Sequence, residues 1–143
     1  MRASVANKPS VAFVGASWVA LLLGVGAYLL GLWNAEMLLN EKGYYFTLLL
    51  FGLFAAVSVQ KSVRDRADGI AVTAIYYGLA WFSVLAALLL LAIGLFNATL
   101  TLSEKGFYAM AYALSLFAAI AVQKNTRDNA GASSEPPRLP EQS

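Results

Sequence analysis

Four long apolar stretches separated by short polar ones form the pattern of this chain. The first, residues 11–33, contains no charged residue, and the others cover residues 44–59, 70–96 and 107–122. At 1.5 Å per residue the first would reach about 34 Å as a helix, enough for a hydrocarbon core of about 30 Å. The second stretch is shorter and gains a turn from residues 40–43. The pattern predicts an all-α membrane protein with four transmembrane helices.

Composition agrees with a lipid environment. Hydrophobic residues make up 59% of the chain and charged residues 13%, with a mean hydropathy of +0.64, whereas a soluble domain carries about 25% charged residues. The first stretch is longer than the apolar region of a typical signal peptide, and no small-x-small cleavage site follows it, so we interpret it as a membrane helix.

Residue types restrict the chemistry of the chain. It has no cysteine and no histidine, and its eight acidic residues are scattered. The usual ligands of zinc, haem and iron–sulfur clusters are therefore missing, and we expect no metal site, no cofactor and no catalytic residue. The ten basic residues are dispersed and the net charge is only +2, which does not favour a nucleic-acid partner.

Basic residues fall unevenly on the two sides of the predicted spans. One side holds Arg2, Lys8, Lys61, Arg64, Arg66, Lys124, Arg127 and Arg138, and the other holds Lys42 and Lys105. The positive-inside rule places the richer side, and with it both termini, in the cytoplasm. We expect a cytoplasmic N-terminus over residues 1–10, two-helix units over residues 11–66 and 67–128, and a disordered cytoplasmic tail over residues 129–143.

The two units are copies of one another. With an offset of 63 residues and no gap, residues 31–65 and 94–128 are identical at 18 of 35 positions, several of them polar. Each unit crosses the membrane twice, so the copies have the same orientation. The sequence predicts two tandem helical hairpins related as a parallel repeat, by a pseudo-two-fold axis along the membrane normal.

The repeated motifs carry a resemblance to a known family. The succession GLWNA, NEKGYY and QKxxRD returns as GLFNA, SEKGFY and QKxxRD, and it resembles the YiaA/YiaB family of bacterial inner-membrane proteins, in particular the longer YiaA-like members with two copies of a two-helix domain. The resemblance covers nearly the whole chain. It implies a multi-pass protein of the inner membrane of a Gram-negative bacterium, and it implies no particular molecular activity.

The predicted periplasmic side offers one set of candidate interaction residues. Asn40 and Ser103 suit the N-cap position, and a glutamate in the first turn interacts favourably with the helix dipole. Capping chemistry is the simpler interpretation, and the alternative is a common external site flanked by both copies. The residues concerned are Asn34, Glu41, Lys42, Asn97, Glu104 and Lys105.

The predicted cytoplasmic side offers the second set, in the two Gln-Lys-x-x-Arg-Asp motifs. Their charges are explained by Arg–Asp pairing and contact with anionic headgroups, and the alternative is docking of a cytoplasmic partner. The residues are Gln60, Lys61, Arg64, Asp65, Gln123, Lys124, Arg127 and Asp128. We further predict a hydrogen bond between the two glutamines across the pseudo-axis.

Small residues recur at every fourth position inside the spans. The ladders are Ala12, Ala16, Ala20 and Gly24 in the first span, Gly52 and Ala56 in the second, and Ala111, Ser115 and Ala119 in the fourth. Such residues let helix backbones approach closely. Packing within one chain and assembly of several copies both remain open.

Three classes of function remain for such a chain. The first is a structural or accessory membrane protein that binds a membrane-protein partner or an anionic lipid. The second is a passive pore or small-molecule transporter formed by a homo-oligomer, and the third is a membrane enzyme. We rank them in this order, because no nucleophile and base cluster together and no ionisable residue or proline interrupts a span.

Overall fold

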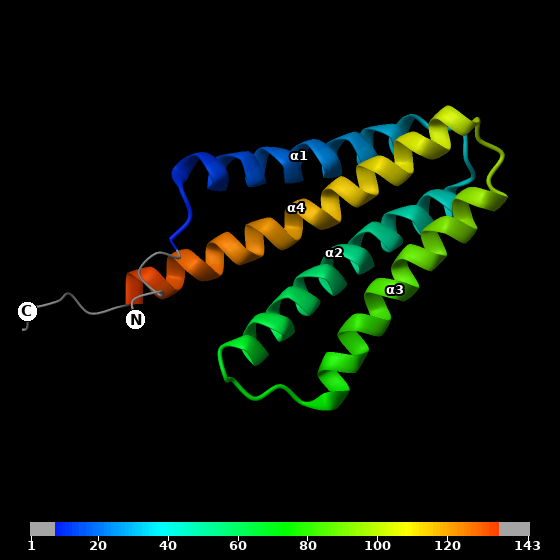
Figure 1. Cartoon of the computed structure of the whole chain (residues 1–143). Helices are drawn as coiled ribbons and strands as arrows, with labels where there is room; N and C mark the ends of the chain where they lie inside the picture. The colour runs from blue at the N-terminus through cyan, green and yellow to red at the C-terminus, as the bar shows by residue number, and fades with distance from the viewer. Residues whose placement is uncertain (1–7, 135–143) are drawn as a thin grey trace, which may run out of the picture.

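The structure, a computed structural model, describes residues 8–134, which form four α-helices and, in this range, no strand. They are α1 (Val11–Asn34), α2 (Leu39–Ala67), α3 (Ala74–Asn97) and α4 (Leu102–Ser134) (Figure 1). Each is long and apolar enough to cross a membrane. The predicted all-α fold with four spans is confirmed. Arg2, Arg138 and most of the expected tail lie outside the described residues.

Local signals explain where the helices begin and end. Ser10 Oγ accepts a hydrogen bond from the Phe13 N–H of α1, and Thr73 Oγ1 accepts one from the Tyr76 N–H of α3. Because Thr73 is the N-cap, α3 begins at Ala74 and residues 70–73 are not helical, although the apolar stretch starts at residue 70. Gly69, with φ of 79°, follows the end of α2, a conformation that glycine adopts without strain.

The end of α4 differs from the sequence-based boundary. We expected disorder from residue 129 onward, but the helix continues to Ser134. Ala130 and Ala132 are good helix formers that offset the weak propensity of Gly131, and the first proline of this region is Pro136, so no proline in residues 129–134 stops the helix.

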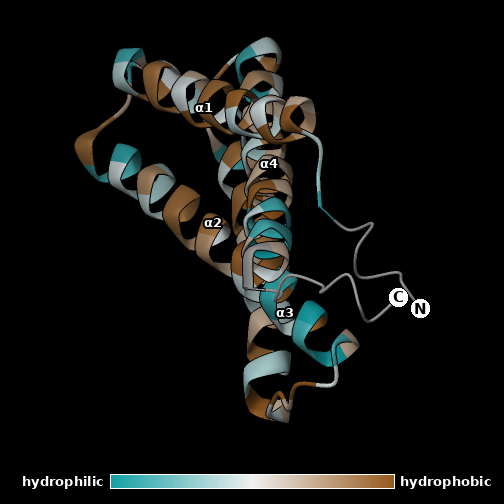
Figure 2. Cartoon of the chain, turned by 90° about the vertical axis from the view of Figure 1, so that its left-hand side faces the viewer, coloured by the Kyte–Doolittle hydropathy of each residue, from teal (hydrophilic) through white to brown (hydrophobic). Residues whose placement is uncertain are grey.

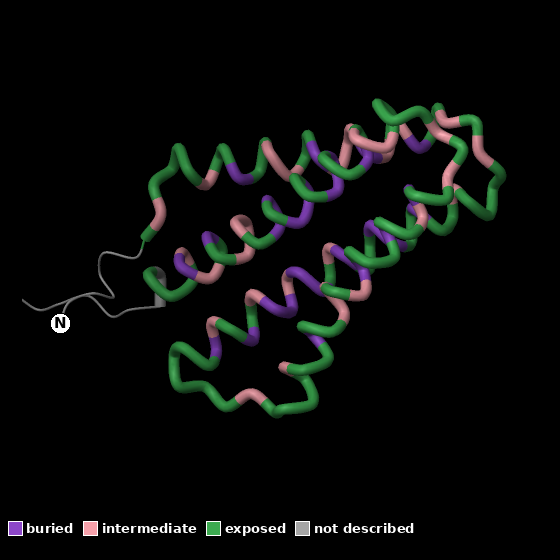
Figure 3. The backbone as a smooth tube through the Cα atoms, turned by 45° about the vertical axis from the view of Figure 1, so that its right-hand side comes forward, coloured by how far each residue is buried: buried purple, intermediate pink, exposed green. Residues whose placement is uncertain are grey.

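The helices pair between the two units and hardly within them. α1 packs along α4 and α3 packs along α2, while α2 and α4 lie side by side at the centre (Figure 1). Hydrophobic residues run along the helices and hydrophilic ones gather toward their ends (Figure 2). Buried positions follow the faces that these pairs share (Figure 3). The first helix of each unit is therefore held by the second helix of the other unit.

The two ends of the molecule have different character. Residues 35–38 and 98–101, which join α1 to α2 and α3 to α4, lie together at one end, called here the turn end (Figure 1). The start of α1, the α2–α3 connection and the end of α4 lie at the opposite end, called here the charged end.

A cluster of tyrosines forms the core near the turn end. Tyr45 and Tyr108 occupy equivalent positions in the two units, and their rings stack with centroids 6.3 Å apart, so the pseudo-two-fold axis passes between them. The Tyr28 hydroxyl donates to the Tyr45 carbonyl at 2.8 Å, and the Tyr112 hydroxyl donates to the Leu48 carbonyl at 2.9 Å. These bonds satisfy buried polar groups where lipid offers no partner.

Part of the small-residue ladders packs against other helices of the same chain. A β-carbon on Gly24 would lie 2.9 Å from the Ser115 backbone nitrogen, so α1 and α4 approach closely there. The small residues of the α2 and α4 ladders are buried, whereas Ala12 and Ala16 are exposed. Each four-residue step turns about 40° around a helix, so the first turns of the α1 ladder rotate away from α4.

Candidate functional site: the interlocked ion pairs

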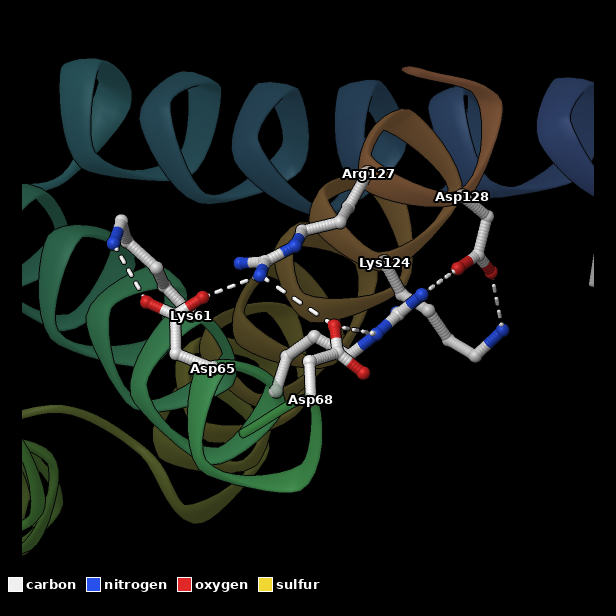
Figure 4. A network of polar contacts seen from close by, with 7 residues as sticks. Lys61, Asp65, Asp68, Lys124, Arg127 and Asp128 are labelled. Atoms are coloured by element: carbon white, nitrogen blue, oxygen red, sulfur yellow. Dashed lines mark hydrogen bonds and ion pairs between the residues drawn. The ribbon is translucent and has the colours of Figure 1, made fainter. Parts of the chain in front are cut away.

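The two Gln-Lys-x-x-Arg-Asp motifs meet at the charged end. They follow directly on the apolar stretches, which end at Val59 in α2 and Val122 in α4. Because α2 and α4 lie side by side, the helical turns that continue past the apolar stretches face each other. The structure thus brings the charged residues of both motifs into one cluster, called here the interlocked ion pairs (Figure 4).

The pairing is reciprocal between the two units. Arg64 of α2 donates to Asp128 of α4, and Arg127 of α4 forms an ion pair with Asp65 of α2. Within each helix a lysine adds an i,i+4 pair, Lys61 to Asp65 at 2.8 Å and Lys124 to Asp128 at 2.9 Å. The predicted Arg–Asp pairing is present, and it joins the two units rather than neighbours in one motif.

Asp68 is a member of the cluster that sequence analysis missed. Its carboxylate lies 3.5 Å from Arg64 Nε and 3.6 Å from an Arg127 terminal nitrogen, so it contacts both arginines. The equivalent position of the second unit is Gly131, which means that the cluster departs from two-fold symmetry here. The spacing of four residues from Arg64 was the signal that could have revealed Asp68.

Both central carboxylates are buried and charged. Asp65 and Asp128 are 5% and 6% exposed. Hydrogen bonds from Lys61 and Arg127 lower the pKa of Asp65 below its ordinary value. Burial raises the pKa of Asp128, but hydrogen bonds from Lys124 and Arg64 outweigh it and the pKa is lowered overall. Both aspartates are therefore ionised at neutral pH, and the cations compensate the cost of burying them.

The predicted hydrogen bond between Gln60 and Gln123 is wrong. Within the described residues no hydrogen bond joins them, and the Gln60 Oε1 atom is buried without a partner. A different polar contact lies nearby, where the Asn125 side-chain amide donates to Ser17 Oγ at 3.1 Å. It joins α4 to α1, a helix pair that the sequence does not reveal.

The predicted turn-end residues make local bonds at the helix ends. Asn34 and Asn97 donate to the carbonyls of Leu30 and Ile93, each four residues earlier in its own helix. Lys42 Nζ lies 3.1 Å from the Trp33 carbonyl, and Lys105 Nζ lies 3.5 Å from the Phe96 carbonyl. Both lysines therefore bind the end of the preceding helix, a role that explains their repetition.

The glutamates complete the N-termini of α2 and α4, with one correction to the expected caps. The caps are Leu38 and Thr101, because both helices begin before Asn40 and Ser103. Glu41 and Glu104 each accept a hydrogen bond from the backbone N–H of the cap residue, at 2.9 Å. Thr101 Oγ1 accepts in return from the Glu104 N–H, a reciprocal capping box.

The alternative interpretation, one external site flanked by both copies, corresponds in the structure to two separate pockets. Glu41 and Asn97 line one pocket, and Glu104 and Asn34 line a second. Each pocket therefore combines residues of both units. In the described part of the chain, no group of three or more aspartates and glutamates could hold a metal ion.

The chain is a duplicated four-helix membrane protein whose two units hold each other's helices. The yiaA/B two helix domain matches residues 13–65 and again residues 76–128, copies offset by the same 63 residues as the repeated motifs. The chain belongs to the YiaA/YiaB family.

Two relatives place the chain within the family. It is 60% identical over 119 residues to the inner membrane protein YiaA of Escherichia coli (strain K12), which covers 83% of this chain and 82% of that protein. It is 46% identical over 63 residues to the uncharacterized membrane protein YubF of Bacillus subtilis (strain 168), which covers 43% of this chain and 72% of that protein. No solved structure gives a significant match.

Proposed function

We propose that this chain is a non-enzymatic accessory protein of the bacterial inner membrane, whose charged end lies in the cytoplasm and binds anionic headgroups. The location is supported by the name of its Escherichia coli relative, an inner membrane protein. The observation that carries the proposal is the build of the charged end. Its carboxylates are engaged by arginines while cationic side chains remain accessible around them.

The charges of the cluster leave a cationic rim. Four cations, Lys61, Arg64, Lys124 and Arg127, surround the three aspartates that they contact, so the cluster carries one net positive charge. Both lysine side chains are 53% exposed. Arg66 is also exposed, and its guanidinium lies 4.3 Å from the centre of the Tyr77 ring. Such a rim next to the membrane surface attracts anionic lipids.

The orientation can be tested by labelling, because the chain contains no cysteine. Glu36 and Ala67 are exposed residues at the turn end and the charged end. In intact spheroplasts a membrane-impermeant maleimide is expected to label the Glu36→Cys variant and to spare the Ala67→Cys variant until the membrane is opened. Labelling in the reverse order would contradict a cytoplasmic charged end.

Headgroup binding is tested by native mass spectrometry of the full chain extracted with its surrounding lipid. The Lys61→Gln/Lys124→Gln variant is expected to bind anionic phospholipid about thirtyfold more weakly than the unchanged chain, since each of the two lysines near the surface contributes about 1 kcal/mol. The Lys42→Gln/Lys105→Gln variant makes the same charge change at the turn end and should retain as much anionic phospholipid as the unchanged chain. Equal losses in both variants would contradict the proposal.

The same spectra distinguish the other classes of function. A foreign protein retained at fixed stoichiometry would make that protein, rather than lipid, the partner of the charged end. A bare ring of identical subunits would replace the proposal by an oligomeric pore or transporter, and flux measurements in liposomes would follow.

A further inference from the structure

Two equivalent pockets open at the turn end. The first, of about 340 Å³, lies between the start of α2 and the end of α3, and the second, of about 320 Å³, lies between the start of α4 and the end of α1. Their lining residues correspond position by position through the 63-residue offset. Asn97 and Asn34 are the last residues of α3 and α1, so both pockets lie where the apolar spans end, at the level of lipid headgroups.

Each pocket is lined by a buried tyrosine whose hydroxyl group has no hydrogen-bond partner among the described residues. Tyr45 and Tyr108 are 5% and 4% exposed, and no hydrogen bond of their hydroxyls exists within the described residues. Neither oxygen is fully enclosed, because neither is among the buried atoms that lack a partner. The other two tyrosines of the cluster, Tyr28 and Tyr112, do bind carbonyls. The hydroxyls of Tyr45 and Tyr108, which line the pockets, are thus left available to a ligand.

A carboxylate and an amide oxygen add acceptors to each pocket. In the described residues Glu41 and Glu104 form no ion pair, and each uses only one carboxylate oxygen, Oε1, for its cap. Asn97 and Asn34 use their side-chain nitrogen toward a helix carbonyl, which leaves their side-chain oxygens unengaged. Each pocket therefore holds one negative charge and several unengaged acceptor oxygens, and Asn40 in the first pocket and Ser103 in the second add a further amide and a further hydroxyl.

Aromatic rings form the remaining wall. Tyr44 and Tyr45 meet edge to face with centroids 5.1 Å apart, and Phe107 and Tyr108 repeat this arrangement at 5.5 Å. The faces of such rings attract cations. Tyr44 and Phe107 occupy equivalent positions in the two pockets. The Tyr44 hydroxyl is engaged with the Leu90 carbonyl at 2.6 Å, and Phe107 has no hydroxyl. The feature that both pockets share at this position is therefore an aromatic ring.

We infer that each pocket binds a primary ammonium group, supplied by the headgroup of an aminophospholipid. A carboxylate, a free hydroxyl and an amide oxygen can each accept one N–H of an ammonium group, while the aromatic wall stabilises its charge. A divalent metal ion would need several convergent carboxylates, and each pocket has one. The position at headgroup level favours a lipid over a soluble amine. This inference concerns the turn end and does not depend on the function proposed for the charged end.

The inference is tested on the full chain purified in detergent, with phosphatidylethanolamine, phosphatidylcholine and free ethanolamine as probes and native mass spectrometry as the readout. The unchanged chain is expected to retain up to two phosphatidylethanolamine molecules in preference to phosphatidylcholine. In Glu41→Gln/Glu104→Gln, glutamine still accepts the cap hydrogen bond but lacks the charge, and affinity should fall about tenfold or more. Either single variant should retain one molecule.

Matched variants separate binding from folding. Tyr45→Phe/Tyr108→Phe removes only the unpartnered hydroxyls, so we expect several-fold weaker retention with an unchanged melting temperature. Glu36 lies at the turn end, in the connection between α1 and α2, but lines neither pocket. The Glu36→Gln variant therefore removes a nearby charge and should bind phosphatidylethanolamine normally. Binding of free ethanolamine with the same dependence on the glutamates would assign a soluble amine as the source. Equal retention by all variants, or no preference for the primary ammonium group, would overturn the inference.

Discussion

Gly24→Ala is expected to destabilise the fold by about 2 kcal/mol, because a methyl group has no space where α1 crosses α4. The β-carbon would lie 2.7 Å from Ser115 Oγ and 2.9 Å from its backbone nitrogen. Ser115 is fully buried and its hydroxyl binds the Ala111 carbonyl at 2.7 Å, so it cannot rotate away without losing that bond. The two helices must separate, and forced expansion of a packed core costs about 1–3 kcal/mol.

The control for this substitution lies in the same helix. A β-carbon on Gly26 would meet nothing within 4 Å, so Gly26→Ala should leave stability unchanged or raise it by up to about 1 kcal/mol through helix propensity. The measurement is the unfolding free energy of both variants in the same detergent, followed by circular dichroism. Equal stability of the two variants would mean that α1 and α4 are not in this close contact.

Arg64→Ala is the second substitution with a large expected effect. It removes the contact that crosses from α2 to Asp128 in α4 and leaves that buried carboxylate with Lys124 alone. Loss of one partner of a fully buried pair costs about 3–5 kcal/mol, and exposed pairs are worth less than about 1 kcal/mol. Since the Arg64 side chain is 22% exposed, we expect a loss of about 2 kcal/mol.

A double-mutant cycle shows whether the loss belongs to the contact between units. Arg64→Ala, Asp128→Ala and the double variant should give a coupling energy of about 1–2 kcal/mol, measured as differences in unfolding free energy. Arg66→Ala is the matched control, because this neighbouring arginine contacts Tyr77 and forms no ion pair in the described range. A coupling energy near zero would mean that the pair does not hold α2 and α4 together.

The pairing of helices gives these predictions a common basis. If each hairpin packed on itself, substitutions at the contacts between the units would have little effect. Here α1 packs on α4 and α3 packs on α2, so the first helix of each unit depends on the other unit. The interlocked ion pairs and the Tyr45–Tyr108 stack lie toward opposite ends of the α2–α4 contact. The two copies are therefore packed against each other like the subunits of a dimer joined in one chain.

The sequence by itself determined the spans, the duplication and the family. Uninterrupted apolar runs define membrane helices because lipid leaves backbone groups no partner outside the helix, and motifs such as Glu41-Lys42-Gly43 and Glu104-Lys105-Gly106 reveal the repeat directly. Helix-end chemistry was also readable, since a glutamate or lysine in a first turn acts on groups a few residues away. The exact caps were misplaced, because the structure has Leu38 and Thr101 in this role instead of Asn40 and Ser103. The end of α4, at Ser134, was also misplaced.

Only the tertiary structure decided which helices meet. An apolar helix surface looks the same in sequence whether lipid or another helix covers it, so the α1–α4 and α2–α3 pairs could not be predicted. The same reason hid the reciprocal pairing of Arg64 with Asp128 and of Arg127 with Asp65, the place of Asp68, and the pockets that combine Glu41 with Asn97. These contacts join residues far apart in the chain, and the backbone geometry that brings them together follows from close approaches such as that of Gly24 to Ser115.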